Sequence, residues 1–297
     1  MKLKYSALTL ILAVAACMSP AFAQVDYTFD NVQYSSGGTV DTFTQFLGIN
    51  NQGVVAGYHG ATVNKGFTYF SNTKEFVQEN YPGSAQTQVI GINNLGKTVG
   101  FYITPSGQTK GFQFGSGIYT SSNFPSTPFN QLLGQNDEAQ SAGYYSGNTA
   151  GTDPDHAYIY DETGSTFEQF VLPNSVQAQA TGINNAGNVC GFTIDSKSVS
   201  HGWLQIGGIV QILNYPESTG TVALGLNNKG QVVGSYTDAS NNSHGFVYTL
   251  STKKWQSIDD PDGVDTTVVN GINDNGLLVG FYGTSPINTS FIATPKP

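Results

Sequence analysis

One short motif recurs six times along the chain at nearly constant spacing. In most copies it reads Gly, an aliphatic residue, Asn, Asn or Asp, a variable residue and Gly. Its leading glycines are spaced by 43, 43, 48, 43 and 46 residues, and they are Gly48, Gly91, Gly134, Gly182, Gly225 and Gly271. Internal repeats with a period in the forties are typical of β-propellers and related arrays. The chain is therefore expected to contain six copies of one structural unit.

Each copy contains four short segments with the composition of β-strands. The Asn and Gly residues after the first segment favour a tight turn, because Asn bonds its own backbone and Gly accepts a positive φ. A proline usually follows the fourth segment, as suits the end of a strand. No segment has a sustained apolar period of 3.6 residues, so we predict an all-β fold. In the first copy, the second, third and fourth segments are 54–58, 66–69 and 75–81.

The two ends of the chain are out of phase with the repeat. Residues 27–34 read as a fourth strand that precedes the first motif, whereas 290–294 read as a third strand with no fourth strand after it. Pairing these two segments would close a ring and cover two strand edges. We therefore predict a six-bladed β-propeller with four antiparallel strands per blade, in which the N-terminal strand joins the C-terminal blade. The predicted units span 27–70, 71–114, 115–161, 162–206, 207–250 and 251–297.

The first 23 residues have the pattern of a secretory signal peptide. A charged start precedes an apolar run at 7–16, and an Ala-Phe-Ala cleavage site ends at Ala23. The apolar run is shorter than the ~20 residues that a membrane-spanning helix needs. We therefore expect a secreted or periplasmic protein with a single domain at 24–297. The alternative is a lipobox that ends at Cys17, which would then carry a lipid anchor.

The composition limits the classes of partner. The chain has 20 acidic residues and 11 basic residues, all of them lysine, and its formal net charge is −9. Phosphate recognition relies on clustered basic side chains, above all arginine, so nucleic acid is an unfavourable partner. We expect a monomer without a transmembrane segment. Cys190 would be the one cysteine left after cleavage, and because its repeat position holds Ala or Val elsewhere, we predict a small buried side chain.

A second recurring unit is histidine, a small residue and an aromatic residue. It occurs as His156-Ala157-Tyr158, His201-Gly202-Trp203 and His244-Gly245-Phe246. Together with the Gly-Ile-Asn-Asn motif, these units resemble the HAF-type repeats of secreted bacterial proteins over nearly the whole mature chain. The first, second and sixth copies depart from that pattern, with Lys65, Lys110 and Ser290 before the aromatic residue or its neighbour. The resemblance implies export and a repeat architecture, and it implies no catalytic residue.

The titratable residues give only weak signals of chemistry. Three of the four histidines share one repeat position, which favours a structural role over catalysis or metal binding. His59 stands where most other copies have tyrosine, so it is a candidate general base, with a surface histidine as the alternative. In the acidic run 259–265, calcium is a candidate cofactor and an ordinary turn is the alternative. The candidate calcium ligands are Asp260, Asp262 and Asp265.

We expect the ligand site on the face that holds two sets of loops, those that enter the first strand and those that join the second strand to the third. Tyrosine rings can cover the C–H faces of sugars while amides bond sugar hydroxyls. The candidate binding residues are Tyr58, Tyr102, Tyr144, Tyr145, Tyr236, Tyr282 and Gln135. A set of glutamines three residues before the motif glycine is expected either to form a polar ring at the channel or to bond adjacent blades; these are Gln45, Gln88, Gln131 and Gln179.

The third copy is the least regular. Gln135 replaces an aliphatic residue, Ala139 replaces the turn glycine, and the insert at 146–155 brings two aspartates. Insertions in repeat proteins often lie on a binding face, although drift in a tolerant loop explains them equally well.

Two functions are compatible with this sequence. The leading prediction is a secreted binding propeller for a glycan or for an extracellular or cell-envelope protein. The alternative is a polysaccharide hydrolase or lyase that uses two carboxylates across a cleft, with His59 or a tyrosine as partner. The candidate catalytic carboxylates are Asp153, Asp155, Glu217 and Asp262.

Overall fold

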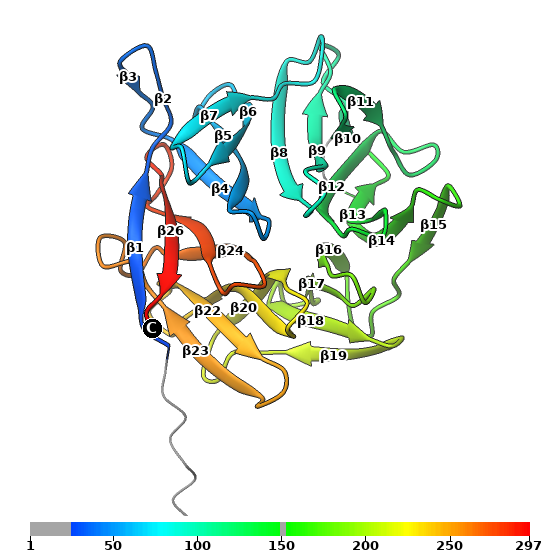
Figure 1. The fold of residues 1–297 in the computed structure, drawn as a ribbon. Coiled ribbons are helices and arrows are strands. Elements are labelled where there is room, and N and C mark those ends of the chain that lie inside the picture. The colour runs from blue at the N-terminus through cyan, green and yellow to red at the C-terminus, as the bar shows by residue number, and fades with distance from the viewer. Residues whose placement is uncertain (1–24, 149–152) are drawn as a thin grey trace, which may run out of the picture.

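The computed structural model describes residues 25–148 and 153–297. Within these ranges the chain forms 26 β-strands and no helix, which confirms the all-β prediction. Figure 1 shows the sheets arranged as a propeller around a central axis. In the described ranges we find no helix with the length and apolar character needed to cross a membrane. The predicted signal peptide and Cys17 lie outside the described residues.

Four sheets of the ring contain four strands each. The first repeat supplies β4 (Thr44–Ile49), β5 (Val54–His59), β6 (Lys65–Phe70) and β7 (Glu75–Gln78). The fourth supplies β16 (Gln177–Ile183), β17 (Val189–Ile194), β18 (Ser200–Ile206) and β19 (Ile209–Leu213). The fifth supplies β20 (Gly220–Leu226), β21 (Gln231–Thr237), β22 (Ser243–Thr249) and β23 (Lys254–Ile258). The last sheet consists of β24 (Val268–Ile272), β25 (Leu278–Tyr282), β26 (Thr289–Pro295) and β1 (Tyr27–Val32).

The second and third repeats form one eight-stranded sheet. The second repeat supplies β8 (Gln86–Ile92), β9 (Thr98–Ile103), β10 (Thr109–Gly115) and β11 (Ile118–Ser121). The third supplies β12 (Phe129–Gln135), β13 (Gln140–Ser146), β14 (His156–Asp161) and β15 (Thr166–Gln169). The prediction of six separate four-stranded blades is therefore wrong. The ring has four such blades, and the remaining part of it is this larger sheet.

The joint within the eight-stranded sheet is a single parallel pairing of Thr109 on β10 with Phe129 on β12. Lys110 supports this contact, because its Nζ donates a hydrogen bond of 2.9 Å to the carbonyl oxygen of Thr127. Similar parallel contacts at two other junctions remain isolated bridges. Sequence periodicity counts the copies of a unit, but it does not determine whether the main chains of adjacent copies come within hydrogen-bond distance.

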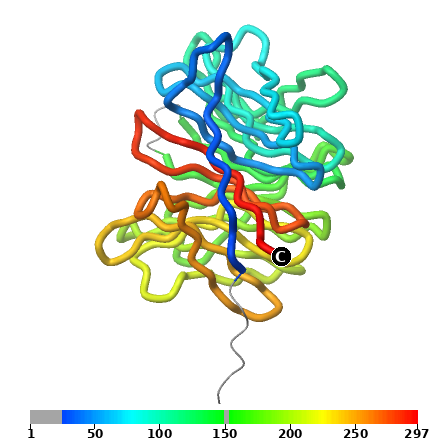
Figure 2. The backbone as a smooth tube through the Cα atoms, turned by 60° about the vertical axis from the view of Figure 1, so that its left-hand side comes forward, coloured from blue at the N-terminus to red at the C-terminus, as the bar shows by residue number. Residues whose placement is uncertain are grey.

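The predicted pairing of the two chain ends is confirmed. β1 is antiparallel to β26, with Tyr27 opposite Pro295 and Val32 opposite Ser290. Figure 2 shows these two strands side by side. The pairing completes the last sheet and covers the edge of β26, which would otherwise be open to other chains.

An additional hairpin lies between β1 and β4. It consists of β2 (Ser35–Ser36) and β3 (Thr39–Val40), and it projects from the periphery of the ring (Figure 1). The turn is formed by Gly37 and Gly38, both with positive φ, as two-residue hairpin turns require. The sequence analysis did not predict this hairpin.

The hydrophobic core repeats around the ring. At its centre are fully buried aromatic side chains from the third strands: Phe67, Phe112, Tyr158, Trp203, Phe246 and Phe291. A glycine on the second strand makes room for each ring. A Cβ atom on Gly57, for example, would lie 2.8 Å from the Phe67 ring and 2.3 Å from the Gln45 carbonyl oxygen. Cys190 lies in the same core as predicted, and burial raises the pKa of its thiol to about 12.

Candidate functional site

The first strand of every repeat lines a central channel. At its wide end is a cavity of about 370 Å³. The lining combines amide, aromatic and aliphatic side chains and contains no charged residue; it comprises Gln45, Leu47, Tyr58, Gln88, Ile90, Phe101, Gln131, Leu133, Gln179, Thr181, Phe192, Leu224 and Asn270. Alternation along the first strand explains most of this lining, since every second side chain faces the axis, and second strands add Tyr58, Phe101 and Phe192. The wide end is thus a neutral cavity of mixed polarity.

Three of the four glutamines of the wide end both line the cavity and bond adjacent repeats. Gln88 donates from Nε2 to Asn64 Oδ1 at 2.7 Å, and Gln179 donates to Asp155 Oδ2 at 2.7 Å. Gln45 makes the equivalent bond to Asn288 across the closing junction, at 3.0 Å. Both roles that the sequence left open for these glutamines are therefore realised, and the bonds fix the positions of their side chains at the cavity.

Two of the predicted tyrosines are buried near the wide end. Tyr58 lines the cavity, and its hydroxyl donates to Gln45 Oε1 at 2.6 Å. Burial raises the pKa of Tyr58 to about 12. Tyr144 is also buried, and burial together with the nearby Asp155 charge raises its pKa. Both phenols are therefore neutral hydrogen-bonding groups at physiological pH.

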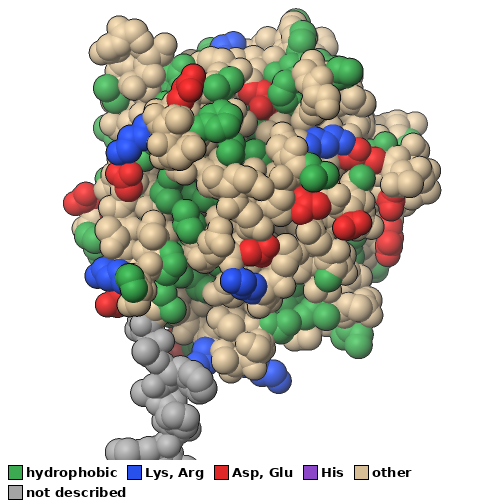
Figure 3. All heavy atoms as spheres, viewed as in Figure 1, with side chains coloured by type: hydrophobic (Ala, Val, Ile, Leu, Met, Phe, Trp, Pro, Cys, Tyr) green, Lys and Arg blue, Asp and Glu red, His purple; other side chains and the backbone are tan. Residues whose placement is uncertain are grey.

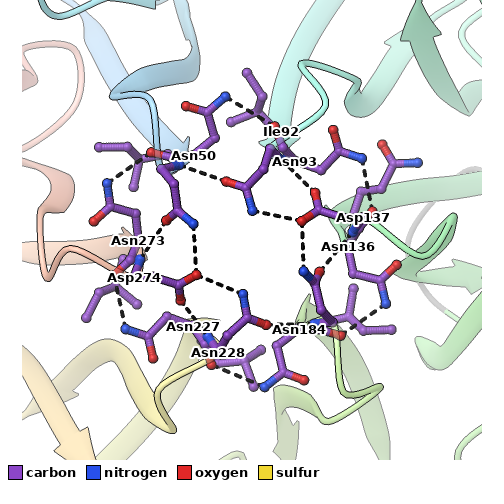
Figure 4. Close-up of a pocket in the computed structure, with 18 residues that line it drawn as sticks. Asn50, Ile92, Asn93, Asn136, Asp137, Asn184, Asn227, Asn228, Asn273 and Asp274 are labelled. Carbon is purple, nitrogen blue, oxygen red and sulfur yellow. Dashed lines mark hydrogen bonds between the residues drawn. The ribbon is translucent and has the colours of Figure 1, made fainter.

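The narrow end of the channel is lined by two rings of hydrogen bonds (Figure 4). In the first ring, the first motif Asn of each repeat donates from Nδ2 to the main-chain oxygen of its counterpart in the next repeat, at 3.0–3.2 Å. The ring members are Asn50, Asn93, Asn136, Asn184, Asn227 and Asn273. Each Oδ1 also accepts main-chain N–H groups of its own turn, as Asn50 does from Gln52 and Val54. One side chain thus shapes the turn and joins two repeats.

The second ring runs through the following motif position. Each main-chain N–H donates to the side-chain oxygen of the next repeat, at 2.7–2.9 Å. Four members are asparagines, and the other two are Asp137 and Asp274, which lie three repeats apart. The Oδ2 atom of each aspartate accepts one amide from the asparagine on either side. These polar groups bond to one another, so the narrow end holds the ring together.

Three of the other four predicted tyrosines are engaged in stacking within the sheets. Tyr102 stacks on Tyr81 with ring centroids 3.7 Å apart, and Tyr236 stacks on Tyr215 at 3.6 Å. Tyr145 stacks in the same way on Phe124, at 4.1 Å. The sequence signal for these pairs is the aromatic residue before the proline that ends most fourth strands. Tyr102, Tyr145 and Tyr236 are all partly exposed, and the structure does not place them in the lining of the wide-end cavity.

His59 occupies the stacking position of the first repeat. Its ring lies on Tyr34 with centroids 3.6 Å apart, and its Nδ1 is 2.9 Å from Asp41 Oδ2. Its Nε2 is 3.1 Å from the amide nitrogen of Gln78, which therefore donates to it. Tyr34, Asp41 and His59 border a second cavity, beneath the β2–β3 hairpin. The structure pairs His59 with Asp41 and not with any of the four carboxylates that the sequence suggested as catalytic partners.

The repeated histidines bond the loops around them. His201 lies between Asn214, at 3.0 Å from Nδ1, and Asp195, at 3.4 Å from Nε2. His244 lies between Asp259, at 3.0 Å from Nδ1, and Asp238, at 3.6 Å from Nε2. These contacts join the loop before the third strand to the end of the fourth strand. They fit the structural role that was predicted for this position.

The four candidate catalytic carboxylates have different surroundings. Asp155 is half-buried and accepts the Gln179 amide; burial raises the pKa of Asp155, although that hydrogen bond and the nearby His156 oppose the shift. Asp153 is exposed, and its main-chain oxygen accepts the hydroxyl of Ser146. Glu217 is exposed in the turn before β20, with φ of +61°. Asp262 precedes β24 in the last repeat and bonds Asn31.

Gln135 takes part in a polar contact between the second and third repeats. Its Nε2 donates to Glu162 Oε1 at 2.7 Å, and Gln113 donates to the same oxygen. The other carboxylate oxygen of Glu162 accepts Lys97 Nζ. The Oε1 atom of Gln135 is buried without a hydrogen-bond partner. The irregular residue of the third repeat therefore serves the junction inside the eight-stranded sheet.

Removing the Lys97 ammonium is expected to weaken this junction. The side chains of Lys97 and Glu162 are 29% and 20% exposed, so Lys97→Met would leave a largely buried carboxylate without its counter-ion. We expect a loss of about 1–2 kcal/mol in the free energy of unfolding, measured by urea denaturation. The matched control is Lys74→Met, whose exposed pair with Asp30 spans 4.0 Å and should contribute less than about 0.5 kcal/mol. Equal losses in both variants would contradict a special role for the junction.

Comparison with solved structures identifies the same architecture. A putative TolB from Agrobacterium tumefaciens has a TM-score of 0.59 at 10% identity, covering 86% of this chain and 91% of that one. The β-propeller domain of the Trilobed protease from Pyrococcus furiosus has a TM-score of 0.51 at 9% identity, covering 85% and 95%. The fold is a β-propeller. TolB from Acinetobacter baumannii has a TM-score of 0.56 at 12% identity over 72% of this chain, which spans 54% of that protein.

Sequence comparison gives no family assignment. No family model matches the chain, and no curated protein matches it. Because the structural similarities have identities of 9–12%, they show the fold alone.

Proposed function

We propose that this protein is an exported binding propeller and that its ligand site is the wide end of the central channel. The observation that carries the proposal is the cavity of about 370 Å³ with its neutral lining of amides, aromatic rings and aliphatic side chains. This volume lies at the low end of the range for small-molecule sites. The cavity therefore suits one sugar residue of a glycan.

The chemistry of the lining supports a neutral sugar. The rings of Phe101 and Phe192 can cover C–H faces, while the amides of Gln88 and Gln131 can bond hydroxyl groups. A charged ligand would find no counter-ion among the lining residues. Figure 3 shows lysine and acidic side chains dispersed among uncharged ones on the face in view, with no basic patch there that would attract a polyanion. Export rests on the N-terminal sequence pattern and on the resemblance to secreted repeats.

Binding is favoured over hydrolysis by the surroundings of the candidate carboxylates. A glycosidase needs two carboxyl groups roughly 5–10 Å apart across the bound sugar. Asp155 is bonded to Gln179 of the fourth repeat, whereas Asp262 is bonded to Asn31 on β1. None of the four candidates is a lining residue of the cavity. The site is therefore better suited to holding a sugar than to cleaving it.

Filling the cavity tests the proposal. We expect the purified protein to bind a neutral oligosaccharide from a glycan array, and we expect Leu133→Trp to weaken that binding at least tenfold without lowering Tm. Leu133 is a half-buried channel residue, so the indole would occupy the cavity. Ile118→Trp is the matched control, since Ile118 is 66% exposed on the outer strand β11. Affinity should be measured by isothermal titration calorimetry.

Several outcomes would contradict the proposal. New reducing or unsaturated ends in the incubated glycans would identify an enzyme. Unchanged affinity in Leu133→Trp would locate the ligand elsewhere on the molecule. Binding confined to proteins of the cell envelope would replace the glycan by a protein partner.

A further inference from the structure

The fourth strand of the fifth repeat is followed by a carboxylate where the other fourth strands are followed by an apolar or aromatic side chain. The residue at this position after β23 is Asp260, and its equivalents after the other fourth strands are Tyr34, Tyr81, Phe124, Leu172 and Tyr215. Four of these five stack on the residue at the end of the second strand. In the last repeat that residue is Tyr282, and the main chain of Gly263 covers its ring, since a Cβ on Gly263 would lie 2.2 Å from a ring carbon.

Asp260 is fully buried, with 0% of its surface exposed. Its Oδ1 accepts the main-chain N–H of Asp262 at 2.8 Å. Its Oδ2 is buried and has no hydrogen-bond partner. Burial raises the pKa of Asp260 and the Asp262 charge adds to the shift, whereas the hydrogen bond from the Asp262 main chain and the nearby Asn31 amide oppose it. A buried carboxylate oxygen without a partner is costly, so this atom needs a ligand.

Three segments of the chain meet around this carboxylate. Asp262 belongs to the same loop, and its Oδ2 accepts the amide of Asn31, on the N-terminal strand β1, at 3.0 Å. The same amide nitrogen lies 3.4 Å from the hydroxyl of Tyr282, on β25. Burial raises the pKa of Tyr282, and the charges of Asp260 and Asp262 raise it further. The carboxylates of one loop, the Asn31 side chain of β1 and the Tyr282 hydroxyl of β25 therefore meet at the closing junction of the ring.

We propose that Asp260 and Asp262 bind a calcium ion at this junction. Asp260 Oδ2 and the Asp262 carboxylate are the ligands from side chains, Asn31 positions Asp262, and main-chain oxygens and water complete the coordination. Calcium accepts six to eight oxygen ligands in flexible geometry, whereas magnesium requires a near-ideal octahedron. In the part of the chain that the structure describes, no group of three or more His, Cys, Asp or Glu side chains could hold a metal ion. With two carboxylates, the affinity should be that of extracellular calcium modules, about 10⁻⁴–10⁻³ M.

Asp265, the third aspartate that the sequence suggested as a calcium ligand, is not part of this site. Asp265 Oδ1 is 4.0 Å from His244 Nε2, and the Asp265 side chain is 53% exposed. The sequence suggested three aspartates because they are close in the chain, and it did not suggest Asn31, which is more than two hundred residues away. The ion would join the loop before β24 to β1 and would therefore stabilise the closed ring.

Thermal unfolding with and without calcium tests this site. After treatment with EDTA, the purified protein should gain about 3–5 °C in Tm on addition of 5 mM (roughly five to fifty times Kd) CaCl₂, and much less with MgCl₂. Asp262→Asn should abolish the gain in Tm, because it removes one of the two carboxylate ligands. Asp262 is exposed, so its replacement should leave the fold intact. Asp265→Asn is the matched control from the same loop and should keep the gain. Terbium provides a direct probe, since excitation of Tyr282 should sensitise its emission in the wild type and in Asp265→Asn only.

The results that would overturn the proposal are distinct. A Tm independent of calcium, together with no tyrosine-sensitised terbium emission, would show that Asp260 Oδ2 is neutralised by a proton instead of an ion. Equal loss of the calcium effect in Asp262→Asn and Asp265→Asn would place the ion elsewhere on the loop. Glycan binding at the channel does not involve these residues, so failure here leaves the proposed function standing.

Discussion

Asn93→Ala should lower the free energy of unfolding by about 3 kcal/mol, because it removes one member of the first ring, which the first motif asparagines form. Asn93 is 5% exposed. Its Nδ2 donates to the Asn136 oxygen at 3.0 Å, and its Oδ1 accepts the N–H groups of Leu95 and Lys97 at 3.1 and 2.9 Å. Alanine would leave these buried or partly buried groups without partners, each at a cost of about 1–3 kcal/mol if no water replaces the bond. Urea denaturation measures the loss.

Two further variants separate the roles of this side chain. Asn93→Asp keeps the acceptor for the turn but, once ionised, cannot donate to the next repeat. Its loss in the free energy of unfolding should therefore be smaller at a pH where the new carboxyl is protonated, because the O–H group can then replace the missing donor. Leu95→Ala is the control, since Leu95 lies in the same turn and is 76% exposed. If Asn93→Ala is no less stable than Leu95→Ala, the ring of hydrogen bonds does not stabilise the protein.

The sequence predicts these asparagines as turn residues, but it does not predict the ring. The motif Asn-Asn-x-Gly indicates a turn because its chemistry is local. The bond from Asn50 to the Asn93 carbonyl depends on how closely two repeats pack, and nothing in either turn encodes that distance. The recurrence of asparagine in all six copies was the one available signal, since a turn alone tolerates several residue types.

The candidate site shows the same division between local and long-range information. Alternation along the first strands predicts that Gln88 and its equivalents face the channel, and the cavity contains them. The tyrosines of the second strands were predicted to be free for a ligand, yet Tyr102 and Tyr236 stack on Tyr81 and Tyr215. From local sequence, an aromatic residue before proline predicts the end of a strand. The residue on which it stacks can be identified only when the pairing of the strands is known.

The separate-blade prediction failed for a related reason. Equal spacing of the motif implies equal units, whereas the pairing of Thr109 with Phe129 depends on the path of one loop. Closure by β1 could be predicted, because a missing fourth strand at one end and an additional strand at the other are both visible in the sequence.

Glu79→Gln should stabilise the protein in a pH-dependent manner. Glu79 is 4% exposed between the first two repeats, where its Oε1 accepts the hydroxyl of Thr98. Burial raises the pKa of Glu79 from 4.5 to about 7, although the hydrogen bond from Thr98 opposes the shift. Between these two values the folded state binds a proton that the unfolded state releases, so stability falls as the pH rises from about 4.5 to 7. Above pH 7 the full cost of the buried charge remains.

Glutamine keeps the acceptor for Thr98 and cannot ionise, so its advantage should grow along that pH interval. We expect the two proteins to have nearly equal stability below pH 4.5, and we expect Glu79→Gln to be more stable by about 3 kcal/mol above pH 7. Urea denaturation at a series of pH values measures this difference. Glu75→Gln is the control, because Glu75 is exposed on β7, the strand that ends just before Glu79, and its replacement should have a small effect at every pH. A difference between Glu79→Gln and the wild type that does not change with pH would mean that Glu79 titrates in the folded protein as it does in the unfolded chain.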